Sequence, residues 1–220
     1  MKLSLHKVRV MINGNEVLHD ISFEACAGEI CGLLGKNGSG KTTTLLSIIG
    51  AYHITGGYLY LDDCKLNGMD IRERIEKGLL IVPQSLHQFW ITCYQDYGGY
   101  IVGMNVYENV YAVTQDHEAA RDWLLLFGLE GVKEVRPSDI SWGQQQRLAL
   151  LRMCALEPKV LLMDEVFGAA DWHMEAQLKA FLKKNIKDKG IIGIYTASNP
   201  HSIEGFCSKQ VMVENGTTAV

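Results

Sequence analysis

Residues 35–42 read Gly35-Lys36-Asn37-Gly38-Ser39-Gly40-Lys41-Thr42 and fit the pattern G-x-x-x-x-G-K-[ST] at every defined position. Glycines let such a loop wrap closely, so that its backbone N–H groups point inward at phosphate oxygens. The apolar run Glu29 to Leu34 precedes the loop, and a helical pattern from Lys41 to about Ile49 follows it and ends at Gly50. This order of strand, glycine-rich loop and helix predicts a phosphate-binding loop within an α/β fold.

The loop predicts a binding site for a nucleoside triphosphate. The Lys41 side chain would reach the β- and γ-phosphates, and the Thr42 hydroxyl would hold Mg²⁺. The positive N-terminal end of the following helix adds to the attraction for phosphate. The predicted nucleotide-binding residues of this segment are Gly35, Lys36, Asn37, Gly38, Ser39, Gly40, Lys41, Thr42 and Thr43.

A second apolar run, Val160 to Met163, ends in two carboxylates, Asp164 and Glu165. In a phosphate-loop site, Asp164 would organise the Mg²⁺ shell together with Thr42. Glu165, next to it, would polarise the attacking water as a general base. Without a phosphate loop upstream, the same pattern would indicate only a strand followed by a solvated acidic turn.

Short apolar runs alternate with helical patterns along the chain, which predicts an α/β fold. The N-terminal part is predicted to be β-rich, with strands over 3–12 and 17–23 joined by an Asn13-Gly14 hairpin turn. Helices are expected over 106–113, 118–127 and 144–156, and further strands over 58–61, 79–82, 160–163, 191–195 and 210–213. We therefore expect a single domain over 1–220, with a P-loop NTPase core of 1–84 and 157–220 and an inserted α-helical subdomain of 85–156.

Composition narrows the class of protein. The chain has 220 residues, of which 47% are hydrophobic and 21% charged, and its net charge is −4. These values are typical of a globular domain and give no reason to expect nucleic acid or an anionic membrane surface as a partner. The six cysteines lack a C-x-x-C pair and zinc spacing, so we expect reduced thiols in a cytosolic protein. Charged residues interrupt the first residues too early for the apolar core of a signal peptide, so we expect none, and no apolar run is long enough to span a bilayer, so we expect membrane association to depend on a partner.

Further segments resemble motifs of the ABC-transporter ATPases. Gln84, after the apolar run Leu79 to Val82, resembles their glutamine loop. Ser141-Trp142-Gly143-Gln144-Gln145-Gln146-Arg147 resembles their signature sequence, Leu-Ser-Gly-Gly-Gln followed by Gln and a basic residue. Gly168-Ala169-Ala170-Asp171 resembles their D-loop. The resemblance covers nearly the whole chain, which is therefore similar to one ABC-type nucleotide-binding subunit.

The resemblance implies a working dimer in which ATP lies between the P-loop of one subunit and the signature of the other. Ser141, Gly143 and Gln144 would then bind the nucleotide held by the partner, and Ser141 can also be an ordinary helix N-cap. Gln84 is expected to join Lys41 and Glu165 as a catalytic residue, to join Thr42 and Asp164 around Mg²⁺, and to report to integral-membrane subunits. The subunit would sit in the cytoplasm, peripherally on the inner face of the cell membrane.

The sequence departs from the family pattern at three places. Trp142 stands where the signature has its first glycine, and its ring would either crowd the interface or turn outward. The family's switch histidine is replaced by Ala197, followed by Ser198, and His201 comes four residues late. Losing a hydrogen bond to the γ-phosphate predicts slow hydrolysis. The adenine-stacking aromatic is also missing, since Val10, Met11 and Ile12 occupy its place, which predicts weaker nucleotide binding.

The branch of the family stays open at this point. Residues 99–109 resemble the C-terminal ATPase half of ribose- and galactose-type sugar importers, which favours a sugar importer. Asp164-Glu165-Val166 with Ala170-Asp171 resembles instead the ATPases of polysaccharide and teichoic-acid exporters. A low-turnover partner of a more active subunit is a third interpretation. ATPases of this type that act on DNA or ribosomes usually carry two fused ATPase domains or long coiled-coil insertions and need basic surfaces, and the sequence shows none of these features. The aromatics of segment 85–98 would either line a groove for a membrane partner or pack on the helical subdomain.

Overall fold

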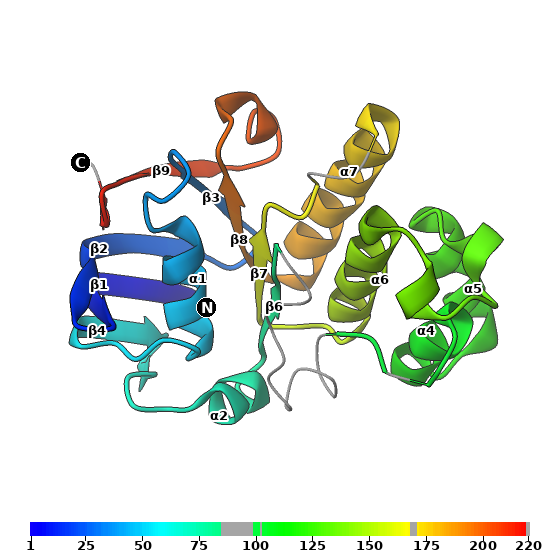
Figure 1. Ribbon diagram of the computed structural model, residues 1–220, viewed down its shortest axis with the longest axis horizontal. Helices are drawn as coiled ribbons and strands as arrows, with labels where there is room; N and C mark the ends of the chain where they lie inside the picture. Colours follow the sequence, from blue (N-terminus) through cyan, green and yellow to red (C-terminus); the bar gives the residue numbers. More distant parts are fainter. Residues whose placement is uncertain (85–98, 102, 168–170, 219–220) are drawn as a thin grey trace.

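The computed structural model describes residues 1–84, 99–101, 103–167 and 171–218. Within these residues, ten strands form one mixed sheet with the order β5-β4-β1-β2-β10-β9-β3-β8-β7-β6. Figure 1 shows the antiparallel strands at one end of the molecule and a group of helices beyond the other end of the sheet. The predicted α/β class, a P-loop core with a β-rich N-terminal part and added helices, is confirmed.

The β-rich part is built from a long hairpin. Strands β1 (Lys2–Ile12) and β2 (Asn15–Cys26) pair antiparallel, and β4 (Gly56–Leu61) pairs with the other edge of β1. Asn13 and Gly14 both have positive φ, 51° and 81°, which is the turn geometry that the Asn-Gly pair favours. The short strand β5 (Cys64–Lys65) pairs with β4 and has no counterpart in the sequence prediction.

The other half of the sheet contains parallel strands. These are β3 (Ile30–Leu34), β6 (Leu79–Val82), β7 (Val160–Asp164) and β8 (Ile192–Ala197), with β9 (Lys209–Glu214) parallel to β3 and β10 (Thr217–Thr218) beside β9. Every residue of β3, β6, β7 and β8 is buried, as expected for strands covered on both faces. Because the strands are parallel, their carboxyl ends meet at one edge of the sheet, where the phosphate loop, the acid pair and Gln84 follow.

The helices are α1 (Lys41–Ile49), α2 (Ile71–Glu76), α4 (Val106–Thr114), α5 (His117–Leu126), α6 (Trp142–Ala155) and α7 (Trp172–Lys189). Short 3₁₀ turns cover Glu130–Val132, Pro137–Asp139 and Pro200–Ser202. Helices α4 to α6 gather beyond the β6 edge, drawn in green at the right of Figure 1. None of the helices in the described ranges is both long and apolar enough to cross a membrane.

The predicted helices occur where expected, with shifts of one or two residues at their ends. Helix α6 starts at Trp142 rather than Gln144, because Ser141 caps it. Helices α2 and α7 and strand β10 have no counterpart in the sequence prediction. The aromatic segment 85–98 and the first three D-loop residues lie outside the described residues. The division into a core and a helical subdomain stays a prediction, since α6 packs against β6 of the core as well as against α4.

Candidate functional site

The phosphate loop turns sharply at two glycines that adopt left-handed backbone angles. Gly38 has φ 80° and Gly40 has φ 109°, and Gly40 is the residue from which α1 begins. The Lys41 side chain is only 5% exposed, and its Nζ donates to the carbonyl oxygens of Gly35 at 2.8 Å and Lys36 at 3.1 Å. Burial lowers the pKa of Lys41, while the carboxylates of Glu165 and Asp164 oppose that shift. The ammonium group is thus held inside the loop, where a phosphate would meet it.

Asp164 ends β7 beside the start of α1. Its carboxylate accepts a hydrogen bond from Thr42 Oγ1, which lies 2.9 Å from Oδ2 and 3.2 Å from Oδ1, and another from Thr196 Oγ1, 2.6 Å from Oδ1. Asp164 is 2% exposed, and this burial raises the pKa of its carboxyl, although the hydrogen bonds from Thr196 and Thr42 lower it in part. A buried carboxylate whose contacts are neutral hydroxyls favours the arrival of a cation.

The donor set of this pair fits Mg²⁺. A carboxylate and a hydroxyl are hard oxygen ligands, and Mg²⁺ in nucleotide sites takes one or two carboxylates together with phosphates and waters. No group of three or more His, Cys, Asp or Glu side chains in the described part of the chain could hold a metal by itself. Thr42 and Asp164 would therefore share such an ion with a bound triphosphate.

Glu165 follows Asp164 and points its carboxylate toward the phosphate loop. Gln84 Nε2 donates to its Oε2 at 3.1 Å, Ser198 Oγ contacts its Oε1, and Lys41 Nζ lies 4.0 Å from Oε1. The backbone of Glu165 is left-handed, with φ 47°, and its N–H donates to Thr196 Oγ1 at 3.1 Å. The structure thus brings together the three predicted catalytic residues, Lys41, Gln84 and Glu165.

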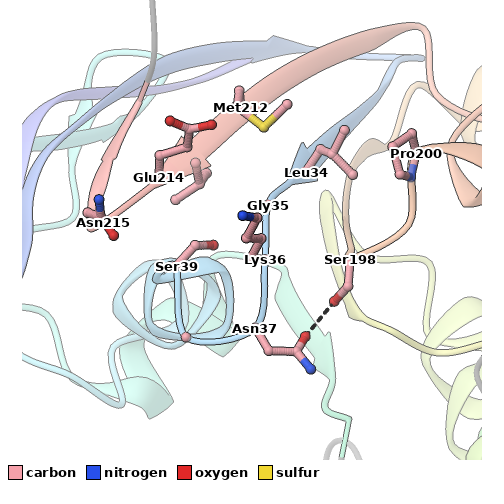
Figure 2. A pocket seen from close by; sticks show the side chains of 12 residues that line it. Leu34, Gly35, Lys36, Asn37, Ser39, Ser198, Pro200, Met212, Glu214 and Asn215 are labelled. Carbon is pink, nitrogen blue, oxygen red and sulfur yellow. Dashed lines mark hydrogen bonds between the residues drawn. The ribbon is translucent and has the colours of Figure 1, made fainter.

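A cavity of about 460 Å³ opens over these groups, within the size range of small-molecule sites. Its lining consists of Val17, Asn37, Gly38, Gly40, Lys41, Thr42, Thr43, Gln84 and Glu165. A second cavity of about 550 Å³ lies on another side of the loop, where Figure 2 shows Ser39, Asn37 and Ser198 around it. The sequence prediction did not include Val17, Thr196 and Ser198. Thr196 was missed because the predicted strand, 191–195, ends one residue before it. A polar residue next to a buried strand is a signal that could have identified it as a site residue.

The predicted signature forms the start of α6. Ser141 accepts a hydrogen bond from the Gln144 N–H at 3.4 Å, and the Gln144 side chain accepts from the Ser141 N–H at 2.9 Å, so the capping role of Ser141 is confirmed. The Trp142 side chain is 37% exposed. Residues 141–144 line neither the cavity of about 460 Å³ nor the cavity of about 550 Å³ at the phosphate loop. The prediction that Ser141, Gly143 and Gln144 bind a nucleotide held by a partner subunit stays a prediction.

Ala197 and His201, the two residues near the expected switch position, differ in burial and in hydrogen-bonding groups. Ala197 is 2% exposed at the end of β8 and offers only a methyl group. The His201 side chain is 81% exposed and pairs with Glu204, with 3.3 Å between Nδ1 and Oε1. Met11, in the region expected to hold an adenine-stacking aromatic, is 50% exposed on β1.

The fold and the site define a P-loop nucleotide-binding protein. The family described as ABC transporter matches residues 18–168, and the chain belongs to this family. A dimeric bacterial ABC transporter cassette has a TM-score of 0.81 and 24% identity, covering 99% of this chain and 97% of that one. The ATP-binding subunit of an ABC transporter also has a TM-score of 0.81, with 22% identity over 100% of this chain and 89% of that one. These two structures show the cassette fold.

Sequence relatives differ in what their names describe. CysA 2 of Agrobacterium fabrum, a sulfate/thiosulfate import ATP-binding protein, is 30% identical over an alignment of 221 positions that covers 98% of this chain and 62% of that protein. LptB of Escherichia coli K12, a lipopolysaccharide export system ATP-binding protein, is 26% identical over 92% of this chain and 83% of its own length. The chain thus spans less than two thirds of the length of the first of these relatives.

Proposed function

We propose that this chain binds and hydrolyses ATP as the nucleotide-binding subunit of an ABC transporter. The observation that carries the proposal is the grouping of Lys41, Thr42 and Glu165 around one cavity of about 460 Å³, with Asp164 hydrogen-bonded to Thr42 beside it. A lysine held by loop carbonyls, a hydroxyl–carboxylate pair and a separate carboxylate supply the three parts that phosphoryl transfer from a triphosphate to water needs.

The reaction follows from these positions. The loop amides and Lys41 would hold the phosphates, which places the γ-phosphorus near Glu165. Glu165 takes a proton from water as the water oxygen bonds to the γ-phosphorus and the bond to the ADP oxygen breaks. Thr42 and Asp164 would hold Mg²⁺, which would supply positive charge against the phosphate oxygens when bound.

Gln84 is proposed to orient Glu165 and to contribute its amide oxygen to the Mg²⁺ shell. Its Nε2 already donates to Glu165, so the amide oxygen is the atom that remains to face an ion. Its backbone carbonyl accepts from Gln146 Nε2 at 3.1 Å, which connects the residue to α6. Gln84 thus contacts both the Glu165 carboxylate and α6, the helix whose start forms the predicted signature.

The working unit is proposed to be a dimer attached to integral-membrane subunits on the cytoplasmic face of the membrane. Ser141, Gly143 and Gln144 do not line the cavities at this chain's own phosphate loop, and a second copy or a related subunit would use them. The dimeric cassette of the same fold supports this arrangement.

The proposal does not specify the transported solute or whether the transporter imports or exports it. The relatives named above are described as import and export proteins, for sulfate or thiosulfate and for lipopolysaccharide, respectively. A sugar-importer assignment gains no support from these names and stays a prediction from the resemblance of residues 99–109. A low-turnover role beside a more active subunit is the second candidate, because the buried Ala197 methyl provides no hydrogen bond to a γ-phosphate.

The test compares ATP binding and steady-state ATPase activity of the parent chain, Lys41→Ala and Glu165→Gln, alone and with the co-purified membrane partners. We expect Glu165→Gln to bind ATP normally and to hydrolyse it about 10²- to 10⁴-fold more slowly, since that is the range of a general base. Lys41→Ala should lose ATP binding. Glu204→Gln, an exposed carboxylate beside His201, is the matched control. A parent chain that hydrolyses ATP no faster than Glu165→Gln in the complex would contradict the proposal.

A further inference from the structure

We propose that Ser198 is a positioning residue that fixes the carboxylate of Glu165, and that it does so in concert with Asn37 of the phosphate loop. The inference rests on the proposed ATPase function and deepens it. Ser198 directly follows β8, one residue beyond the buried Ala197. The contact between Ser198 Oγ and Glu165 Oε1 joins the end of β8 to the end of β7.

Asn37 provides the second contact of the hydroxyl. Its Oδ1 lies 2.8 Å from Ser198 Oγ, and Figure 2 shows the two side chains facing each other, one from the phosphate loop and one from the segment after β8. Ser198 Oγ therefore bridges a loop that would wrap phosphate and a carboxylate that would activate water.

The number of protons on the hydroxyl decides how this bridge is arranged. A serine hydroxyl carries one hydrogen and two lone pairs, so it cannot donate to both Asn37 and Glu165. The charged carboxylate is the stronger acceptor, so the Ser198 hydroxyl donates its hydrogen bond to Glu165. A half-turn of the Asn37 amide then places its NH₂ group against the Ser198 oxygen. The result is a chain of donors from Asn37 through Ser198 to Glu165.

Glu165 is then held on both of its oxygens. Gln84 donates to Oε2 at 3.1 Å and Ser198 to Oε1, while the backbone N–H of Glu165 is tied to Thr196 Oγ1. A non-glycine residue with φ 47° keeps such a conformation only where its surroundings fix it. The two side-chain donors therefore fix the direction in which the carboxylate points.

Neighbouring residues do not offer the same contact. Ala197 has no hydrogen-bonding side chain, and Asn199 uses its Oδ1 to accept from the His201 N–H at 3.0 Å. His201 is exposed and pairs with Glu204. Among the residues that the structure describes between 197 and 201, Ser198 is the one whose side chain is shown bonded to Glu165.

The bridge also connects phosphate binding to the carboxylate. Asn37 lines the cavity over Lys41 and Thr42, so a phosphate that moves the loop would move Asn37 and, through Ser198, Glu165. Ser198 would thus place Glu165 for attack when the loop is filled.

The test uses Ser198→Ala, Ser198→Thr and the control Ser22→Ala, an exposed serine of β2, in the complex with the membrane partners and in the full chain alone. We expect Ser198→Ala to lower kcat about 10- to 100-fold, the range for one hydrogen bond to a charged group. KM and the Kd for ATP should change less than about twofold, because the phosphate contacts remain. Ser198→Thr keeps the hydroxyl and should restore most of kcat, and Ser22→Ala should match the parent.

A double-variant comparison separates positioning from a general structural effect. In the Glu165→Gln background, Ser198→Ala should cause little further loss, because the group it positions is gone. Asn37→Ala should lower kcat in the parent but add little to Ser198→Ala. The inference would be overturned if Ser198→Ala lowered kcat by the same factor in the Glu165→Gln background as in the parent. It would also be overturned if Ser198→Thr hydrolysed ATP as slowly as Ser198→Ala.

The outcomes also distinguish this inference from the proposed function. An active parent that Ser198→Ala leaves unchanged overturns the positioning role alone. A parent no faster than Glu165→Gln overturns the proposed function and this inference with it. Thermal unfolding of each variant verifies that it is folded, and the exposed position of Ser198 makes the substitution tolerable.

Discussion

At the scale of single residues, the site holds a carboxylate that costs stability in the absence of ligand. Asp164 is 2% exposed and receives hydrogen bonds from two threonine hydroxyls. Burial raises the pKa of this carboxyl. An acid whose pKa is higher in the folded state binds its proton more tightly there than in the unfolded chain. Its contribution to stability is therefore present at low pH and is lost as the pH rises through the raised pKa.

Asp164→Asn should therefore stabilise the ligand-free chain at neutral pH while it removes Mg²⁺-dependent ATP binding. We expect the Tm at pH 7 to rise by about 2–4 °C, which corresponds to about 1 kcal/mol for a domain of this size. The gain should shrink as the pH approaches the ordinary range of an aspartic acid, because the wild-type group is then protonated. Thermal unfolding of both proteins between pH 4 and 8 measures this difference in Tm, because the range starts near the ordinary pKa of an aspartic acid. Asp63→Asn, an exposed control, should change Tm little; a lower Tm for Asp164→Asn would contradict the argument.

At the scale of elements, sequence patterns predicted those segments whose signals are local. The bounds of α1, from Lys41 to Ile49, follow from the glycines on either side. Helix α7 was missed, although Asp171 caps its start and Leu178, Leu182 and Ile186 are buried at four-residue spacing. Its other positions are mostly polar, so no broad apolar stripe marks it. The contact of Thr196 with Asp164 could not be predicted from the sequence, because it depends on the register of β7 against β8.

The end of α1 depends on a buried arginine from α2. Arg74 is 2% exposed; its Nη1 donates to the carbonyls of Ser47 at 2.6 Å and Ile48 at 2.9 Å, and its Nε donates to Met69 at 3.1 Å. Burial lowers the pKa of Arg74 to about 10, so the group is still charged at neutral pH. The guanidinium thus satisfies two carbonyls at the negative end of the helix that follows the phosphate loop.

Arg74→Lys should destabilise the chain by about 1–3 kcal/mol, because a lysine provides a charge but not the planar set of donors that reaches three carbonyls. Urea unfolding measures the change. Arg72→Lys is the matched control, since Arg72 is 74% exposed on the same helix and pairs with Glu76 at 3.6 Å. Equal stability of Arg74→Lys and the parent would show that these carbonyls find other donors.

At the scale of the whole molecule, the candidate site is assembled from segments far apart in the sequence. The phosphate loop follows β3, Gln84 follows β6, the acid pair ends β7 and Ser198 follows β8. The parallel strands bring these segments to one edge of the sheet. The motifs predicted which residues belong to the site, whereas the pairings of Ser198 and Thr196 with the acids required the sheet order.

The helical side of the molecule reaches this edge through Gln146. This α6 residue is 1% exposed; its Nε2 donates to the Gln84 carbonyl at 3.1 Å, and its Oε1 has no hydrogen-bond partner within the described residues. A buried amide oxygen without a partner costs free energy, so Gln146 contributes less to stability than its position suggests. The hydrogen bond that its amide does make is to Gln84, whose own Nε2 donates to Glu165.

Gln146→Met should therefore separate stability from hydrolysis. Methionine has a similar shape and removes the unpartnered oxygen, so we expect the free energy of unfolding to stay the same or rise by up to about 1 kcal/mol. The ATPase kcat should fall severalfold while the Kd for ATP is unchanged, because Gln84 loses its connection to α6 but the phosphate contacts remain. Gln177→Met, an exposed glutamine on α7 that donates to Leu126 O at 3.3 Å, is the control. A variant that is destabilised but fully active would mean that Gln146 serves packing and that α6 is not coupled to Glu165 through Gln84.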